Sequence, residues 1–274
     1  MTDPLPPLRD VIAAHGLSAR KSLGQHFLLD LNLTRKIARS ADVAPDDHVL
    51  EIGPGPGGLT RALLETGAQV TAIERDQRCL QALAQVSDAF PQKLTVIEAD
   101  AMAFNERDIV TPPVKIIANL PYNISTELLI KWLRDNQTDR PLWTSMALMF
   151  QKEVADRILA EPGSKTYGRL SIISQATSQP SRAFDLPARA FTPPPKVDST
   201  VVLFHPRENC LDCLPQLEKI TAAAFSQRRK MLRTSIKAVF GDQVEEVLGE
   251  IGLLPTARAE QVCVNDYIKL AAKL

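Results

Sequence analysis

The chain has 274 residues, in which 32 Lys and Arg residues balance 32 Asp and Glu residues. Hydrophobic residues make up 45% and charged residues 23%, which excludes a wholly disordered chain and is enough for one large α/β domain with a smaller appendage. The zero net charge gives no indication of a nucleic-acid partner, so any basic surface must be local. The sequence has no run of 18 apolar residues and no secretory pattern, and we expect a cytoplasmic protein without membrane contact.

Most of the chain alternates short apolar runs with longer amphipathic segments. Strands are expected at residues 49–52, 70–74, 94–98, 114–119, 145–150, 170–176 and 200–205. Helices are expected at residues 31–41, 59–66, 77–86, 126–135 and 152–160. This alternation predicts a parallel, doubly wound α/β sheet.

The pattern changes near Pro206, beyond which only helical periodicity is found. We therefore expect an α/β domain at residues 1–206 and a small all-helical domain at residues 207–274. The four cysteines are too few and too scattered for a disulfide scaffold. Cys210 and Cys213 form a C-x-x-C pair, but a second pair is missing, so we expect no metal site.

A glycine-rich loop follows the first predicted strand of the sheet and opens a helix. Glycines let the backbone turn sharply and let a ligand approach it, and the helix N-terminus adds free N–H donors. Gly53, Gly55 and Gly58 match the dinucleotide pattern G-x-G-x-x-G. Glu51, Gly53, Gly55 and Gly57 also match the acid-x-G-x-G-x-G pattern of S-adenosylmethionine-dependent methyltransferases. The loop alone does not choose between these cofactors, and an ordinary βα turn is the third alternative.

Three carboxylates near the loop bear on this choice. Glu51 can pair with the cationic amino group of a methionine moiety, whereas NAD has no cation there, so Glu51 favours S-adenosylmethionine. Glu74 ends the next predicted strand, where an acidic residue holds the ribose hydroxyls of either cofactor. Asp100 follows the third strand and can accept a hydrogen bond from an adenine amino group, although a helix N-cap is the alternative.

The fourth predicted strand ends in Asn119, Leu120, Pro121 and Tyr122. Ligands bind at the carboxyl ends of strands in doubly wound sheets, so this turn and the glycine loop should face one crevice. The lone pair of an adenine amino group is delocalised, and acceptors on its two hydrogens would free it for attack. The side-chain oxygen of Asn119 and the carbonyl of Leu120 can be those acceptors. Pro121 stiffens the turn, and Tyr122 offers a face on which an extruded base can stack.

The sequence Asn-Leu-Pro-Tyr is typical of adenine-N6 methyltransferases. With its surroundings, the chain resembles the bacterial small-subunit (16S) rRNA adenine-N6,N6-dimethyltransferases over nearly its whole length. The segments that carry the resemblance are residues 21–28, 119–122, 148–154, 167–171, 190–199 and 224–233. The resemblance implies a Rossmann-like class I methyltransferase domain at residues 1–206, S-adenosylmethionine as cofactor, and a helical rRNA-binding domain at residues 207–274.

The resemblance also assigns two further groups of site residues. His26 and Leu28 lie in a segment that closes over the methionine end of the cofactor, so both are expected in its pocket. By the same match they share that pocket with Gly53, Glu74, Asp100 and Asn119. Phe191 is the candidate for a second ring around the target base, opposite Tyr122, and a place in the core is an equally good alternative.

A basic cluster lies in the predicted helical domain. It holds five cations and no acid, namely Arg228, Arg229, Lys230, Arg233 and Lys237. On a single helix the last four would share one face, beside an apolar stripe that includes Leu232 and Ile236. Such a run is usually a solvated helix face, but beside a base-flipping site phosphate contacts are the better interpretation.

The leading hypothesis is an enzyme that transfers methyl groups from S-adenosylmethionine to N6 of two adjacent adenosines in the 3′-terminal hairpin of 16S rRNA. We expect a monomer that acts on the 30S subunit or its precursor and serves small-subunit biogenesis. A 23S rRNA dimethylase conferring antibiotic resistance and a ribosome-assembly factor with incidental catalysis are the alternatives. An NAD-dependent oxidoreductase would leave residues 119–122 unexplained.

Overall fold

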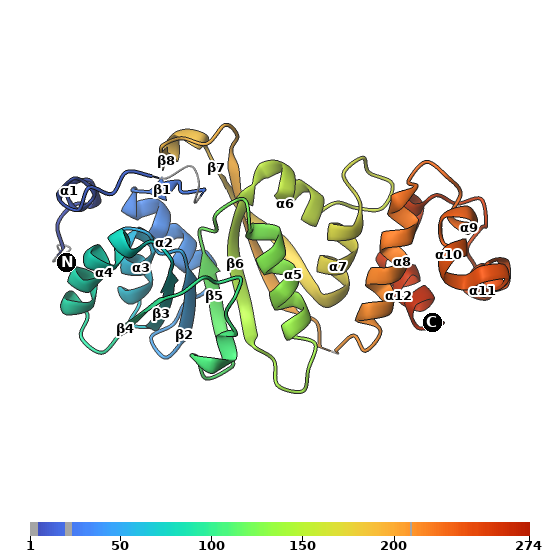
Figure 1. Cartoon of the computed structure of the whole chain (residues 1–274), viewed down its shortest axis with the longest axis horizontal. Coiled ribbons are helices and arrows are strands. Elements are labelled where there is room, and N and C mark those ends of the chain that lie inside the picture. The colour runs from blue at the N-terminus through green and yellow to red at the C-terminus, as the bar shows by residue number, and fades with distance from the viewer. Residues whose placement is uncertain (1–4, 20–23, 209) are drawn as a thin grey trace.

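The computed structural model describes residues 5–19, 24–208 and 210–274 of the chain. Its centre is a seven-stranded sheet with the order β4-β3-β2-β5-β6-β9-β7 (Figure 1). The strands are β2 (His48–Ile52), β3 (Gln69–Glu74), β4 (Leu94–Glu98), β5 (Val114–Ala118), β6 (Trp143–Gln151), β7 (Ser178–Leu186) and β9 (Ser199–Pro206). A separate two-stranded sheet pairs β1 (Phe27–Leu28) with β8 (Phe191–Thr192).

Helices flank the sheet and continue beyond it at the C-terminal end. Those around the sheet are α1 (Leu8–Ala14), α2 (Leu31–Ser40), α3 (Gly58–Leu64), α4 (Gln77–Ala89), α5 (Ser125–Asp135), α6 (Lys152–Ile158) and α7 (Arg169–Thr177). The C-terminal helices are α8 (Leu214–Ser226), α9 (Leu232–Ser235), α10 (Lys237–Phe240), α11 (Val244–Glu250) and α12 (Val264–Ala271), and they lie at the end of the molecule far from the N-terminus (Figure 1). No helix within the described ranges has the length and apolar character that a membrane span requires.

The sheet is mixed, whereas the sequence predicted a parallel one. Strands β2, β3, β4, β5 and β6 are parallel to one another, and β9 is antiparallel to both β6 and β7. The predicted strand at residues 170–176 was wrong, because this segment is helix α7. Most of its side chains are buried, so its apolar run lacks helical periodicity and reads like a buried strand. Strand β7 was missed because it is a polar edge strand that contains Pro180.

Two hydrophobic cores lie on opposite faces of the sheet because successive strand side chains alternate. Leu50 and Ile116 pack on the face covered by α5, α6 and α7. Val49 and Ile117 pack on the other face, with α2 and α3. Strands buried on both faces are apolar nearly throughout, which is why the sequence predicted β2, β3, β5 and β6 correctly. The edge strand β4 is only partly buried, and it was also predicted.

The C-terminal helices share a core with the sheet-flanking helices. Tyr167 lies before α7, and its ring contacts that of Phe225 on α8 with 6.3 Å between centroids. Phe225 in turn lies 6.2 Å from the ring of Tyr267 on α12. One continuous cluster of buried side chains runs from the sheet into these helices. The change from strands to helices falls after Pro206, as expected, while the division into two domains stays a prediction.

A buried carboxylate ties α5 to the loop before β5. Glu106 is fully buried, and its Oε1 accepts a hydrogen bond of 2.7 Å from the Trp132 indole and one of 2.8 Å from Lys131. We expect Glu106→Ala to lower the free energy of unfolding by about 3–5 kcal/mol, because the buried Trp132 indole N–H loses its acceptor and the Lys131 ammonium loses its carboxylate, leaving it two backbone carbonyls. Urea unfolding measures this loss.

The matched control is Glu65→Ala. Glu65 also forms an ion pair, at 2.6 Å from Arg35, but both side chains of that pair are about one-third exposed. Partly exposed pairs contribute about 1 kcal/mol or less. Equal losses for the two variants would contradict a structural role for the Glu106 contacts.

Candidate active site

One pocket at the carboxyl ends of the parallel strands gathers most of the predicted site residues. It encloses about 1180 Å³ including its open mouth. The predicted residues that line it are His26, Leu28, Glu51, Gly53, Gly55, Glu74, Asp100, Asn119, Leu120, Pro121 and Tyr122. Residues 21–23 of the predicted N-terminal cofactor segment lie outside the described residues.

The glycine loop turns sharply beneath the N-terminal segment. Gly55 has a φ of +56°, which other residue types rarely adopt. A Cβ at Gly58 would lie 2.7 Å from the carbonyl oxygen of Leu28, and one at Gly55 would lie 3.1 Å from the Phe27 ring. Glycine at these two positions therefore lets the segment at residues 27–28 cover the loop.

Glu74 connects the end of β3 to the glycine loop. Its carboxylate accepts hydrogen bonds from the backbone N–H groups of Gly55, at 3.0 Å, and Asp76, at 2.7 Å. Burial raises the pKa of Glu74 from its ordinary value, against the opposing effect of these hydrogen bonds. Each carboxylate oxygen has a second lone pair, so the group can still accept hydrogen bonds from ribose hydroxyls.

Glu51 is a buried carboxyl group beside this loop. Its side chain is 1% exposed, and Oε2 makes no hydrogen bond within the described part of the chain. Burial raises the pKa of Glu51 to about 8. A carboxylate there would be stabilised by a cationic ligand, because a buried charge is costly unless it is paired.

Asp100 begins a turn at the pocket rather than capping a helix. Its Oδ1 accepts a hydrogen bond from the Met102 backbone at 3.0 Å, and its Oδ2 pairs with Arg75 at 3.0 Å. The next helical turn begins only at Glu106, with Asn105 as its cap, so the helix-cap alternative for Asp100 was wrong. Both members of the ion pair line the pocket.

Asn119 is oriented by the N-terminal segment. Its Nδ2 donates a hydrogen bond of 3.0 Å to the carbonyl oxygen of His26. A carbonyl oxygen can only accept, so the amide nitrogen must face His26. The amide oxygen of Asn119 therefore stays available as an acceptor, which is the role that the sequence predicted for it.

The sequence predicted that the rings of Tyr122 and Phe191 would lie on either side of a target base, and the structure corrects the position of Phe191. Tyr122 lines the pocket, and burial raises its pKa, so its hydroxyl stays neutral. Phe191 is 2% exposed, packs in the core and does not line the pocket, so the core alternative describes it. The ring that stacks on Tyr122 is His26, at 5.4 Å between centroids. His26 Nδ1–H also donates a 2.7 Å hydrogen bond to the Pro193 carbonyl.

The basic cluster is not on a single helix. Helix α8 ends at Ser226 and α9 begins at Leu232, with a turn between them, so the predicted shared face of the four cations was wrong. Leu232 and Ile236 are buried, as the apolar stripe predicted. The tertiary structure also brings carboxylates to three cations: Glu260 lies 3.8 Å from Arg228, Glu245 lies 2.9 Å from Arg233, and Asp242 lies 3.3 Å from Lys237.

Arg229 and Lys230 lie in the turn and are exposed. Within the described ranges, neither has a carboxylate at ion-pair distance. Arg229 and Lys230 are therefore the members of the cluster that are most available to phosphate groups.

No group of three or more His, Cys, Asp or Glu side chains is placed to hold a metal ion in the described ranges.

The comparisons with known proteins agree with this geometry. A family model described as ribosomal RNA adenine dimethylase matches residues 16–274. The chain belongs to the ribosomal RNA adenine dimethylase family. The match spans residues 119–122 and the other residues that line the pocket.

Relatives of this dimethylase match nearly the whole chain. It is 55% identical to "Ribosomal RNA small subunit methyltransferase A" of Ruegeria sp. (strain TM1040), and the match covers 99% of this chain and 98% of that protein. It is 54% identical to the protein of the same name from Rhizobium johnstonii, with the same coverage. These matches agree with the small-subunit family that the sequence segments indicated.

Two solved structures resemble this dimethylase in fold. A dimethyladenosine transferase from Plasmodium falciparum has a TM-score of 0.78 and 30% identity, over 89% of this chain and 96% of that one. The 23S rRNA methyltransferase ErmE has a TM-score of 0.68 and 25% identity, over 90% of this chain and 99% of that one. The fold is that of a class I methyltransferase, as predicted.

Proposed function

We propose that this dimethylase transfers methyl groups from S-adenosylmethionine to N6 of two adjacent adenosines in the 3′-terminal hairpin of 16S rRNA. The observation that carries the proposal is the pocket in which Asn119, Leu120 and Tyr122 meet the glycine loop and the buried carboxyl groups. The names of the relatives support a small-subunit target over a large-subunit one.

The residues of the pocket fit S-adenosylmethionine. The unpartnered oxygen of Glu51 would receive the cationic amino group, Glu74 the ribose hydroxyls, and Asp100 the adenine amino group. His26 and Leu28 would cover the methionine end. When bound there, the cofactor supplies an activated methyl group.

The chain's own groups would orient the target adenine. The amide oxygen of Asn119 and the carbonyl of Leu120 would accept its two amino hydrogens, and Tyr122 would carry the base after it leaves the stack. A leucine at position 120, rather than a bulkier residue, is compatible with the return of a monomethylated base, so that four transfers would complete two dimethyladenosines. Alignment supplies much of the acceleration, and no strong base is required.

The proposed partner is the 30S subunit or its precursor, on which the protein would act as a monomer in the cytoplasm. Balanced net charge favours a limited RNA footprint, in which the shape of the assembled subunit matters more than bulk attraction. A substrate that is a folded precursor would also give the enzyme a role in small-subunit biogenesis.

The test uses 30S subunits that lack rRNA dimethyladenosine. The protein is incubated with these subunits and S-adenosylmethionine, and the rRNA is analysed by mass spectrometry. We expect dimethyladenosine at two adjacent sites in the 3′-terminal hairpin. Methylation of naked 23S rRNA alone would identify a large-subunit enzyme instead, and no methylation of 30S, 16S or 23S RNA would favour an assembly factor.

Cofactor affinity should depend on pH through Glu51. With a pKa of about 8, this group is protonated at lower pH and must lose its proton to pair with a cation. Between about pH 6 and 7.5 we expect the Kd for S-adenosylmethionine to fall as pH rises, by up to about tenfold per unit. Isothermal titration calorimetry at several pH values measures the slope.

The control for this prediction is Glu51→Gln, which has no proton to lose. This variant should bind S-adenosylmethionine weakly, with a Kd that is nearly independent of pH over the same range. An equally steep slope in this variant would assign the pH dependence to another group.

RNA affinity should depend on Arg229 and Lys230, the two cations of the basic cluster that have no carboxylate partner among the described residues. We expect Arg229→Ala with Lys230→Ala to weaken 30S binding and to reduce the slope of log K against log salt by about 0.7–0.9 per residue. Cofactor affinity should not change. Filter binding over a range of salt concentrations measures both quantities.

The matched control is Arg233→Ala with Lys237→Ala. These cations already have carboxylate partners, so their removal should change the salt slope less. Equal slopes for the wild type and the Arg229/Lys230 variant would contradict the proposed phosphate contacts.

A further inference from the structure

The ring of Tyr122 is held by a residue that lies outside the pocket. Its hydroxyl is 2.6 Å from the Oγ of Ser199. Ser199 is fully buried and does not line the pocket that the described residues form. The Tyr122 hydroxyl is therefore bound to the sheet, and the ring, rather than the hydroxyl, is the part available to a ligand.

Ser199 lies where the proline-containing loop between β7 and β9, residues 187–198, which includes the short strand β8, enters β9. Ser199 is in register with Gln151 of β6 and with Leu186 of β7. A residue paired on both sides cannot shift without breaking strand pairing. Its hydroxyl is thus a fixed point against which the Tyr122 ring can be placed.

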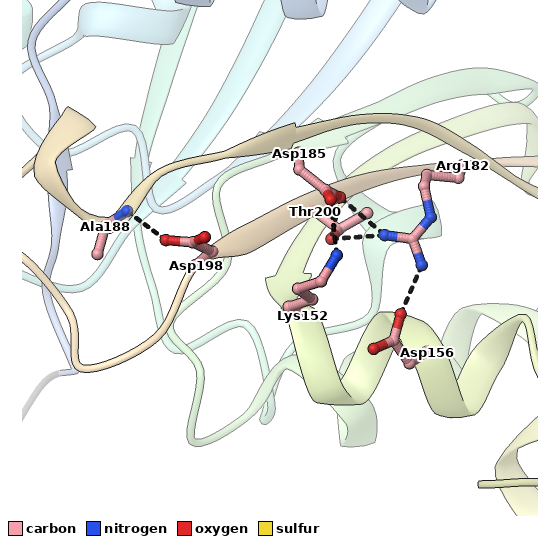
Figure 2. A network of polar contacts seen from close by, with 7 residues as sticks. All are labelled: Lys152, Asp156, Arg182, Asp185, Ala188, Asp198 and Thr200. Carbon is pink, nitrogen blue, oxygen red and sulfur yellow. Dashed lines mark hydrogen bonds and ion pairs between the residues drawn. The ribbon is translucent and has the colours of Figure 1, made fainter.

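Polar contacts tether both sequence neighbours of Ser199 (Figure 2). The side chain of Asp198 accepts a 2.9 Å hydrogen bond from the Ala188 backbone, at the other end of the loop. Thr200 donates a 2.7 Å hydrogen bond to Asp185. The backbone carbonyl of Asp198 also accepts a 2.9 Å hydrogen bond from the Lys152 N–H, at the start of α6.

Asp185 is the centre of the remaining contacts in this network (Figure 2). It accepts hydrogen bonds of 2.7 Å from Lys152 and 2.7 Å from Arg182, and Arg182 also reaches Asp156 at 2.5 Å. These side chains are between 35% and 44% exposed, so each pair contributes little to global stability. Their common effect is local, because they hold the strand ends on both sides of the loop.

The Tyr122 ring has two restraints, and both involve this part of the chain. A tyrosine hydroxyl lies on the long axis of its ring, so the bond to Ser199 prevents the ring from swinging away. Rotation of the ring about that axis is restricted by His26, which stacks on it and donates to Pro193 in the loop. A platform restrained in both ways is pre-organised for a flat base.

We propose that Ser199 is a positioning residue for methyl transfer: it fixes the Tyr122 ring on which the target adenine stacks, and the contacts of Asp198 and Asp185 hold Ser199 in place. The inference rests on the proposed function, because it requires an adenine as the substrate. It assigns a role in turnover to a buried hydroxyl that contacts neither cofactor nor base.

A double-mutant cycle of Ser199→Ala and Tyr122→Phe tests this role, because each change removes one partner of the same hydrogen bond and keeps the ring. We expect each variant to lower kcat/KM for 30S subunits by about tenfold, and the double variant to lose no more than the larger single loss. The Kd for S-adenosylmethionine should stay within about twofold of the wild type.

Ser178→Ala is the matched control. Ser178 is another fully buried serine, at the start of β7, the strand that pairs with β9. Its hydroxyl donates a hydrogen bond of 2.6 Å to the Ser174 carbonyl. Its loss should lower the melting temperature without changing kcat/KM. If Ser199→Ala does not fold, Asp198→Ala replaces it and is made both in the wild type and in the Tyr122→Phe variant. Asp198→Ala should then lower kcat/KM in the wild type but cause no further loss in the Tyr122→Phe variant.

Additive losses in the cycle, or a Ser199 variant that loses only stability as Ser178→Ala does, would overturn the positioning role. A wild-type protein that methylates no RNA would instead overturn the proposed function and the role together. Wild-type activity on 30S subunits therefore separates the two failures.

Discussion

Asn119→Ala is expected to reduce methylation of 30S subunits by at least about 100-fold in kcat. The variant lacks the amide oxygen that would accept an amino hydrogen of the target adenine, and loss of one pre-organised group at a reacting centre typically costs 10²–10³ in rate, about 2.7–4 kcal/mol. Cofactor affinity should change only a few-fold, because the hydrogen bond that Asn119 makes to the described part of the covering segment goes to the His26 backbone. Single-turnover methylation and calorimetry separate the two effects.

Asn105→Ala is the matched control for this change. Asn105 caps a short helical turn outside the pocket, so its loss should leave turnover unchanged. Asn119→Asp gives a second comparison, since it keeps acceptor oxygens but cannot donate to the His26 carbonyl. Unchanged kcat in Asn119→Ala would overturn the catalytic assignment.

Glu74→Ala is expected to weaken S-adenosylmethionine binding by at least about 100-fold. The variant loses the acceptor of the ribose hydroxyls and also leaves the N–H groups of Gly55 and Asp76 without their carboxylate. Hydrogen bonds to a charged group contribute about 1.5–3 kcal/mol each, so two such losses account for this factor. Isothermal titration calorimetry measures the Kd directly.

Two comparisons support the interpretation of that result. Glu74→Gln keeps one acceptor oxygen and should be intermediate. Glu98→Ala removes a carboxylate at the end of the neighbouring strand β4, where it bonds only Gln77 among its described contacts, and should leave the Kd unchanged. If Glu74→Ala and Glu98→Ala weakened S-adenosylmethionine binding equally, the loss would come from removing any carboxylate at the strand ends and not from the contacts of Glu74.

The central strands and the glycine loop could be predicted because their signals are local. Leu50 and Ile116 belong to runs that are apolar on both faces, and such runs need little context to be recognised as buried strands. The pattern from Glu51 to Gly58 and the residues at 119–122 also carry their chemistry within a few positions. Both sit at strand ends, so a parallel sheet necessarily brings them to one pocket.

Other elements could not be predicted because local sequence is ambiguous there. The apolar run of α7 is as compatible with a strand as with a buried helix, and only packing decides between them. The edge strand β7 is largely polar and contains Pro180, so it lacks a strand signal. The cations at residues 228–237 fit one helix by spacing, yet the chain turns before α9 so that Leu232 can enter the core.

The sequence by itself determined the α/β class, the glycine loop at a strand end and the turn at residues 119–122 that we propose to contact the adenine, since each depends on contiguous residues. Only the tertiary structure decided which side chains meet across the chain. It placed the His26 carbonyl on Asn119, Ser199 on Tyr122, Phe191 in the core and carboxylates on three of the five cations. These contacts join residues far apart in sequence, and their formation depends on how whole elements pack rather than on any local preference of the residues involved.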